Sequence, residues 1–160
     1  MKRLFLLAIV AMNLPSCVTL NLSRDTSKLE SHEGVLVTNI VTNAGPYKLA
    51  ILENHSFVSS AILNISSGEN FRVITLPAGD YTWRGIYAGN RYREFNGRYA
   101  FKIVAGVINY IGDMYIDFDP NMSKFRLSLE DHGPEAWQRF KESYPALATS
   151  CTFTSDLPKQ

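Results

Sequence analysis

Residues suited to binding gather in one stretch near the middle of the chain, residues 83–101. These 19 residues hold six aromatic side chains and four of the chain's nine arginines. Trp, Tyr and Arg dominate binding hot spots, aromatic faces stack on sugar rings, and Arg forms paired hydrogen bonds with carboxylate or phosphate. The sequence therefore predicts a hairpin that binds an anionic glycan or a protein partner. Its candidate contact residues are Trp83, Arg84, Tyr87, Arg91, Tyr92, Arg93, Phe95 and Arg98.

An ordinary structural interpretation of the same stretch stays open. In this alternative, Trp83 and Phe101 belong to the hydrophobic core, and the arginines keep an exposed hairpin soluble. The two interpretations differ in where the aromatic rings point, which the order of residues does not determine.

The sequence carries no recognisable catalytic motif. It has no nucleophile elbow, no zinc-protease helix and no phosphate-binding loop. Its histidines, His32, His55 and His132, lie in three different expected loops or tethers, and no two stand at metal-ligand spacing. We therefore predict a protein that is not an enzyme and that holds no metal and no cofactor. A small hydrolase of unfamiliar pattern is the weakest alternative.

Three aspartates near residue 115 are the other group that can do chemistry. Asp117 and Asp119 open like a calcium-binding loop, but Met122 stands where such a loop needs Gly and Ser128 where it needs Glu. Asp113 and Asp117 are expected on one strand face, where two carboxylates can bind a cation or perform acid–base chemistry. The alternative is a solvated strand face that ends in a turn.

The N-terminus has the pattern of an export signal. Lys2 and Arg3 precede an apolar run, Leu4–Met12, that is too short to span a bilayer, which needs about 20 residues. The following Leu14-Pro15-Ser16-Cys17 resembles the lipobox of bacterial lipoproteins, in which a large aliphatic residue stands three places before the cysteine and a small residue just before it.

This resemblance implies a membrane anchor at Cys17. Cleavage before Cys17 makes it the first mature residue, with a diacylglyceryl group on its sulfur and a further acyl chain, such as palmitate, on its amine. Two or more chains anchor a protein stably, whereas a single myristoyl chain binds only marginally. Val18 stands where Asp would retain a lipoprotein in the inner membrane, so the resemblance favours the outer membrane and the periplasm. The alternative is a soluble secreted protein with an incidental cysteine.

Composition limits the remaining classes. The 160 residues are 46% hydrophobic and 19% charged, which is typical of one globular domain, and the formal charge of +1 argues against a nucleic-acid binder. Two cysteines exclude a disulfide-rich scaffold and a Cys-rich zinc module. Once Cys17 is lipidated, Cys151 is the only free thiol, and it either packs as a small apolar residue or pairs with another molecule.

The segment after the cysteine is polar and shows no strand or helix period. We interpret residues 17–33 as a flexible tether that reaches about 20–25 Å as a random coil. In the alternative, Leu20, Leu22 and Leu29 pack on the domain and part of the tether is ordered.

Residues 34–130 show the pattern of short strands. Apolar runs rich in β-branched and aromatic residues alternate with Gly, Asn, Pro and Ser. The runs are Val35–Val41, Tyr47–Glu53, Phe57–Ile65, Phe71–Leu76, Tyr81–Ala88, Tyr99–Val104, Val107–Phe118 and Lys124–Glu130. In the longest run Gly112 marks a bulge or bend. The apolar residues expected on one face of that run are Ile108, Tyr110, Met114, Ile116 and Phe118.

One helix is expected at residues 134–144. Pro134 suits a first helical position, Pro145 ends the segment, and Glu135 and Arg139 are spaced as an i, i+4 ion pair. The aromatic residues of its apolar face are Trp137, Phe140 and Tyr144. Together these patterns predict a mostly β fold, an antiparallel β-sandwich of about seven to eight strands with one short C-terminal α-helix.

A turn motif supports the same fold. Leu76-Pro77-Ala78-Gly79-Asp80-Tyr81, followed by Phe101–Gly106, resembles the turns of carboxypeptidase-regulatory-like and transthyretin-like β-sandwich domains. The resemblance implies a fold and no activity.

These observations predict four segments: a signal peptide at 1–16, the lipidated Cys17 with its tether at 17–33, the sandwich domain at 34–147 and a tail at 148–160. The expected function is a non-catalytic interaction or structural module of the bacterial envelope. It is held to the lipid bilayer through Cys17, binds an envelope protein or a glycan, and does not bind nucleic acid. The alternative is a carbohydrate- or peptidoglycan-binding module that uses the aromatic–arginine hairpin.

Overall fold

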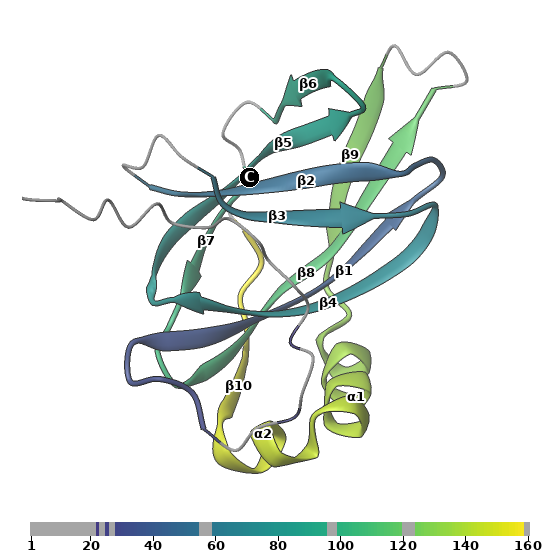
Figure 1. Ribbon diagram of the computed structural model, residues 1–160. Coiled ribbons are helices and arrows are strands. Elements are labelled where there is room, and N and C mark those ends of the chain that lie inside the picture. The colour runs from purple at the N-terminus through teal and green to yellow at the C-terminus, as the bar shows by residue number, and fades with distance from the viewer. Residues whose placement is uncertain are drawn as a thin grey trace, which may run out of the picture.

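Two β-sheets packed face to face form the body of the protein (Figure 1). The computed structural model describes residues 22, 25, 28–54, 59–95, 99–119 and 124–158. The first sheet contains β1 (Glu33–Thr42), β4 (Gly68–Pro77), β8 (Val107–Phe118), β9 (Phe125–Glu130) and β10 (Thr152–Ser155). The second contains β2 (Tyr47–Glu53), β3 (Ser59–Ile65), β5 (Gly79–Ala88), β6 (Arg91–Glu94) and β7 (Ala100–Ile103). The helices are α1 (Gly133–Ser143) and α2 (Pro145–Ser150).

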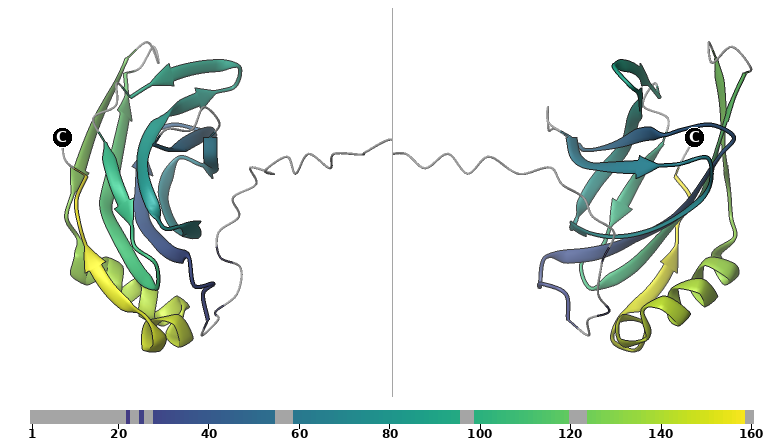
Figure 2. Two further views of the ribbon diagram at one scale, coloured as in Figure 1. Left: turned by 90° about the vertical axis from the view of Figure 1, so that its left-hand side faces the viewer. Right: turned by 45° about the vertical axis from the view of Figure 1, so that its right-hand side comes forward.

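Each sheet has one long strand whose outer edge is shared by two short strands. β10 pairs with the first part of β8 and β9 with its last part, while β7 and β6 divide β5 in the same way. The β5–β6 hairpin and the end of the β8–β9 pair therefore lie at one end of the sandwich, and α1 and α2 lie at the other (Figures 1 and 2).

The predicted fold class is confirmed, with two additions. β1 pairs with β8, and β8 with β10, in parallel, whereas every other pairing is antiparallel among the described residues. Parallel partners need a long crossover, and the whole second sheet lies between β1 and β8 in the chain. A second helix, α2, follows α1 because Pro145 cannot continue one helix but suits the first position of the next.

The main core lies between the sheets. Its largest buried side chains include Trp83 and Tyr81 from the second sheet and Leu36, Ile40 and Ile74 from the first. Burying each such side chain contributes about 1.5–3 kcal/mol. A second cluster lies on the outer face of the first sheet, where Phe140 of α1 packs with Val35, Val37 and Tyr110. β1 is therefore buried on both faces, which explains its near-continuous apolar sequence.

A bulge at Gly112 confirms one expectation and corrects another. Gly112 has φ +93°, and the β1–β8 register shifts so that Val37 opposes Tyr110 but Asn39 opposes Asp113. The extra residue reverses the side-chain alternation along β8. Ile108 and Tyr110 therefore face the helices, opposite to Met114, Ile116 and Phe118, and were wrongly placed on one face with them.

The bulge has a second consequence. It puts Tyr110 and Asp113 on the same outer face, three residues apart, where an unbroken strand would separate them.

The segment before the domain is attached to it at two described points. The amide of Leu22 donates to the Val73 carbonyl (2.6 Å), and the Leu22 carbonyl accepts from the Tyr144 hydroxyl (2.7 Å). The Asp25 carboxylate accepts the amides of Ala146 (2.7 Å) and Leu147 (3.1 Å), so it caps α2 as an N-cap side chain does. Of the expected alternatives, packing on the domain is observed for Leu22 and Leu29, which contact the same cluster, while Leu20 lies outside the described residues.

Candidate functional site

The β5–β6 hairpin carries most of the predicted contact residues, and its two faces differ in content. Gly89 and Asn90 form its two-residue turn, with Gly89 at φ +61°, a backbone conformation that tight hairpins require. The strands pair Tyr87 with Tyr92 on one face. Because successive side chains alternate, the opposite face, toward the first sheet, holds Ile86, Ala88, Arg91 and Arg93.

Two predicted contact residues, Trp83 and Phe95, lie in the core. Trp83 is completely buried and its ring centroid lies 5.5 Å from that of Phe101. Phe95 is 5% exposed and meets Phe125 of the other sheet edge-on at 5.4 Å. A ligand cannot reach either ring in this fold, so the core interpretation holds for Trp83, Phe95 and Phe101. The indole nitrogen of Trp83 has no hydrogen-bond partner among the described residues.

The outer face of the hairpin is already internally paired. The rings of Tyr87 and Tyr92 pack against each other at a tilt of 38°, with their centroids 4.6 Å apart, and the Tyr92 hydroxyl donates to the Arg84 carbonyl (3.2 Å). The Arg84 guanidinium forms an ion pair with Glu94. Gly85 makes this packing possible, because a Cβ there would lie 2.8 Å from the Tyr92 ring. Burial raises the pKa of Tyr92, although the residue stays 38% exposed.

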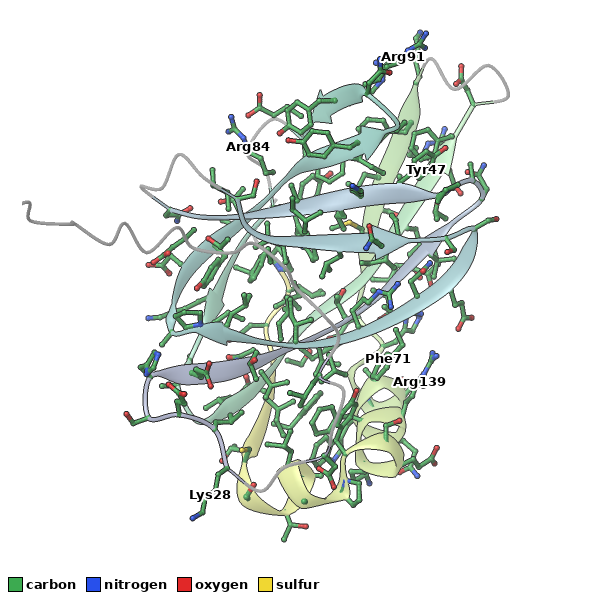
Figure 3. The ribbon with its side chains drawn as sticks, in the orientation of Figure 1. Lys28, Tyr47, Phe71, Arg84, Arg91 and Arg139 are labelled. Carbon is green, nitrogen blue, oxygen red and sulfur yellow. The ribbon has the colours of Figure 1, made fainter. Side chains whose placement is uncertain are left out.

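The inner face ends in an apolar slot with two arginines beside it. The slot has a volume of about 260 Å³ and lies between the sheets at the hairpin end, with Ile86 and Ala88 on one side and Phe118 on the other. Arg91 and Arg93 are exposed and line it too, and neither forms an ion pair with a residue that the structure describes. Figure 3 shows Arg91 at the tip of the hairpin, pointing away from Arg84.

The predicted set therefore separates into three groups. Arg91 and Arg93 adjoin the slot, while Arg84, Tyr87 and Tyr92 form the outer face. Trp83 and Phe95 are core. Arg98 and the candidate lipidation site Cys17 lie outside the described residues.

The acidic cluster does not assemble as one site. Asp113 is 7% exposed, on the outer face under α1. Asp117 stands four residues further along β8, roughly 13 Å away, at an open depression that it shares with Asp119, Lys124 and Arg126. The depression holds both signs of charge.

A polar cluster around Asp113 escaped sequence reasoning. The Tyr110 hydroxyl donates to Asp113 Oδ1 (2.7 Å), and His132 Nδ1 lies 3.2 Å from Asp113 Oδ2. The His132 amide donates to the Tyr110 hydroxyl (3.1 Å). Burial, and then the hydrogen bond to Asp113, raise the pKa of Tyr110. Gly112 was the one available signal, because a bulge there brings Tyr110 and Asp113 to one face.

Three residues of the types that bind metal ions lie close together in one exposed turn. Glu30, His32 and Glu33 bring their ligand atoms within 4.8 Å of one another just before β1. Within the described part of the chain this is the only such group, and its members already contact one another, since His32 Nε2 lies 3.7 Å from Glu30 Oε2.

No protein-family model matches this chain, and no curated protein matches its sequence. None of the helices in the described ranges is both long enough and apolar enough to cross a bilayer.

Proposed function

We propose that this protein is a lipoprotein of the bacterial outer membrane, anchored through acylated Cys17, whose sandwich serves as a non-catalytic interaction module facing the periplasm. The anchoring half of the proposal rests on the export signal and the Leu14–Cys17 motif. The interaction half rests on one observation: two exposed arginines, without ion-pair partners among the described residues, stand beside an apolar slot at the end of the sandwich.

The attachment of Leu22 supports a definite placement of the domain. Cys17 stands five residues before Leu22, a span of at most about 18 Å. The docked tether is therefore shorter than the 17–33 coil expected from sequence, and it holds the β4 edge near the lipid.

The slot lies away from this attachment. The Val73 carbonyl accepts from the Leu22 amide. Val73 pairs with Val37, which in turn pairs with Tyr110, so these three residues form one row across the first sheet. Phe118, at the slot, stands eight residues further along β8, about 23 Å away when the extra residue of the bulge is left out. The hairpin end is thus suited to meet a partner beyond the membrane surface.

The chemistry of the slot indicates the kind of partner. A volume of about 260 Å³ lies just under the roughly 300 Å³ at which small-molecule sites begin, so the slot fits one bulky apolar side chain. Guanidinium groups pair with carboxylates in a planar, bidentate manner. We therefore infer a protein partner that inserts an apolar side chain flanked by Asp or Glu.

The anchor is tested by mass spectrometry of the N-terminal peptide and by fractionation of the native host. We expect an acylated Cys17 in the membrane fraction and release of a Cys17→Ala variant, whose domain is unchanged. An unmodified thiol in a soluble protein would contradict the anchoring half alone.

The partner is tested by cross-linking in intact cells. An Arg91→Glu/Arg93→Glu variant should lose its cross-linked protein, because like charges then face each other, while Lys102→Glu on β7 should keep it. A partner retained equally by both variants would refute the role of the slot.

Glycan binding is a second candidate, favoured by the packed Tyr87–Tyr92 pair on the outer face. Exposed tyrosine rings can stack on sugars, and Tyr92 is partly exposed. Retention on immobilised peptidoglycan that is lost in Tyr92→Ala, but kept in Arg91→Glu/Arg93→Glu, would favour this candidate over the slot.

A further inference from the structure

A cleft of about 210 Å³ lies at the other end of the molecule, between the first half of α1 and the outer face of the first sheet. Its floor is one row across the sheet: Phe71 of β4, Asn39 of β1 and Asp113 of β8. Its walls are Glu69, His132, Glu135 and Arg139. None of these residues belongs to the hairpin site.

The donors in this cleft are already engaged. Arg139 lies over the Phe71 ring, 4.5 Å from its centroid, and its Nη1 is 3.4 Å from Glu69 Oε2 (Figure 3). This pairing replaces the i, i+4 pair with Glu135 expected from sequence. His132 lies against Asp113 through Nδ1 (3.2 Å) and near Glu130 through Nε2 (3.7 Å).

Two acceptors in the cleft have no partner among the described residues. Asn39 is 9% exposed, and its amide nitrogen makes a long contact with Asp113 Oδ2 (3.5 Å), but its Oδ1 accepts no hydrogen bond. The contact with the Asp113 carboxylate determines which end of the amide is nitrogen, so Oδ1 is the unpaired atom. The carboxylate of Glu135 also has no hydrogen-bond or ion-pair partner in the described part of the chain. A buried acceptor without a donor is unfavourable, and native proteins seldom retain one.

These two groups determine the ligand class by complementarity. One unpaired group is a buried neutral oxygen, which needs a hydrogen-bond donor, and the other is an exposed carboxylate, whose negative charge attracts a cation. A hard metal ion needs several oxygen ligands converging on one point, and the described residues of this cleft include no such group of three His, Cys, Asp or Glu side chains. An ammonium group carries a positive charge and three donors on a single small atom.

We propose that this cleft binds a small molecule with a primary ammonium group, which donates to Asn39 Oδ1 and pairs with Glu135. Asn39 Oδ1 has almost no accessible surface, so side chains that line the cleft must shift before the ammonium group can reach it. The Asp113–Tyr110–His132 hydrogen bonds hold the floor in place beneath it.

Calorimetric titration of the full-length protein in detergent, at constant ionic strength, tests this site with n-propylammonium as the probe. We expect saturable binding with a Kd of the order of 1 mM, as suits a ligand of few atoms. Tetramethylammonium has the same charge and no donors, and it should bind at least tenfold more weakly. Methylguanidinium tests whether any donor cation suffices, and equal binding would overturn the choice of an ammonium group.

Four variants make the assignment specific. Asn39→Leu and Glu135→Gln should each weaken propylammonium binding at least fivefold, whereas Arg139→Ala should strengthen it because a competing cation is removed. Glu142→Gln, on the same helix but outside the cleft, is the matched control and should bind like the wild type. If Asn39→Leu does not fold, the affinity of Glu135→Gln for propylammonium alone decides whether the cleft is the binding site.

Several results would overturn the proposal: no saturable binding, tetramethylammonium binding as tightly as propylammonium, or unchanged affinity in Glu135→Gln. Tighter binding of Ca²⁺ than of propylammonium would also overturn it. None of these results affects the proposed anchor or the hairpin slot, because neither involves these residues.

Discussion

The hairpin end and the helix-side cleft differ in how far their polar groups are exposed to solvent. At the hairpin, Arg91 and Arg93 are exposed cations whose solvation by water costs the fold little. At the cleft, Asp113 and Asn39 are buried acceptors, and Asp113 is supported by Tyr110 and His132. The hairpin groups are neighbours in the sequence, whereas Asn39 and Asp113 are 74 residues apart. Binding groups at a surface can therefore be predicted from neighbouring residues of the sequence, whereas buried ones depend on how distant strands pair.

Within the hairpin, different residues contribute to stability and to the proposed binding. Its inner aromatic residues contribute to the core, and its arginines do not. Variants that remove one or the other should therefore divide stability from binding.

The largest effect is expected from Trp83→Ala. Removing a fully buried Trp should lower the free energy of unfolding by about 3–5 kcal/mol, because it loses transfer energy and leaves a cavity. Urea denaturation measures this. Tyr92→Ala, on the outer face of the same hairpin, should cost about 1 kcal/mol. Equal losses in the two variants would mean that the hairpin is not divided into core and surface as described.

The next largest loss of stability is expected from Asp113→Ala, which removes a hydrogen-bond acceptor from the floor of the cleft. It leaves the Tyr110 hydroxyl and His132 Nδ1 without their acceptor, at a cost of about 2–3 kcal/mol by urea denaturation. Asp117→Ala on the exposed part of β8 should change stability by less than about 0.5 kcal/mol. A neutral Asp113→Ala would show that the buried hydrogen bonds do not support the fold.

Alkaline pH should act more strongly on the cleft than on the hairpin. The pKa of Tyr110 is raised by burial and by Asp113, so the folded state keeps a proton that the unfolded state loses near pH 10. Stability is then constant below pH 10 and falls above it by about 1.4 kcal/mol per pH unit for this group. Unfolding measured across pH 9–12 should show this fall removed in Tyr110→Phe and a smaller change in Tyr92→Phe, because the pKa of Tyr92 is also raised by burial but the residue is partly exposed.

Burial also raises the pKa of Tyr81 to about 12, which adds a fall of the same sign over the same range. A Tyr81→Phe variant separates this contribution. A wild-type stability that does not change up to pH 12 would contradict both assignments.

The smallest expected effect has the opposite sign. Asn39→Leu should raise the free energy of unfolding by about 1 kcal/mol, because it removes a buried oxygen that has no described partner and loses only one long contact. Thermal unfolding detects a change of this size. Destabilisation by more than about 1 kcal/mol would mean that Asn39 has a structural partner, and the reason to expect a ligand there would disappear.

Much of the fold could be predicted because strand period and turn composition are local signals. The expected runs Tyr47–Glu53 and Val107–Phe118 coincide with β2 and β8, and the helix expected at 134–144 is α1 to within a residue at each end. Which residues of the aromatic–arginine stretch are core could not be predicted, since the stretch places aromatic residues on both faces of the second sheet. The docking of Leu22 was left open and that of Asp25 was not predicted, because their partners Val73, Tyr144, Ala146 and Leu147 are distant in sequence.

By itself the sequence determined that this chain is β-rich and has a cluster of arginines at residues 84–98, and it predicts an export signal with a candidate lipidation site at Cys17. Composition, hydrophobic period and short motifs are properties of neighbouring residues, so they can be recognised without a structure. Only the tertiary structure decided that Arg91 and Arg93 adjoin a slot, that Trp83 is buried and that Asn39 and Asp113 meet beneath α1. Those facts follow from strand register and from one inserted residue at Gly112, which turns side chains from one face to the other.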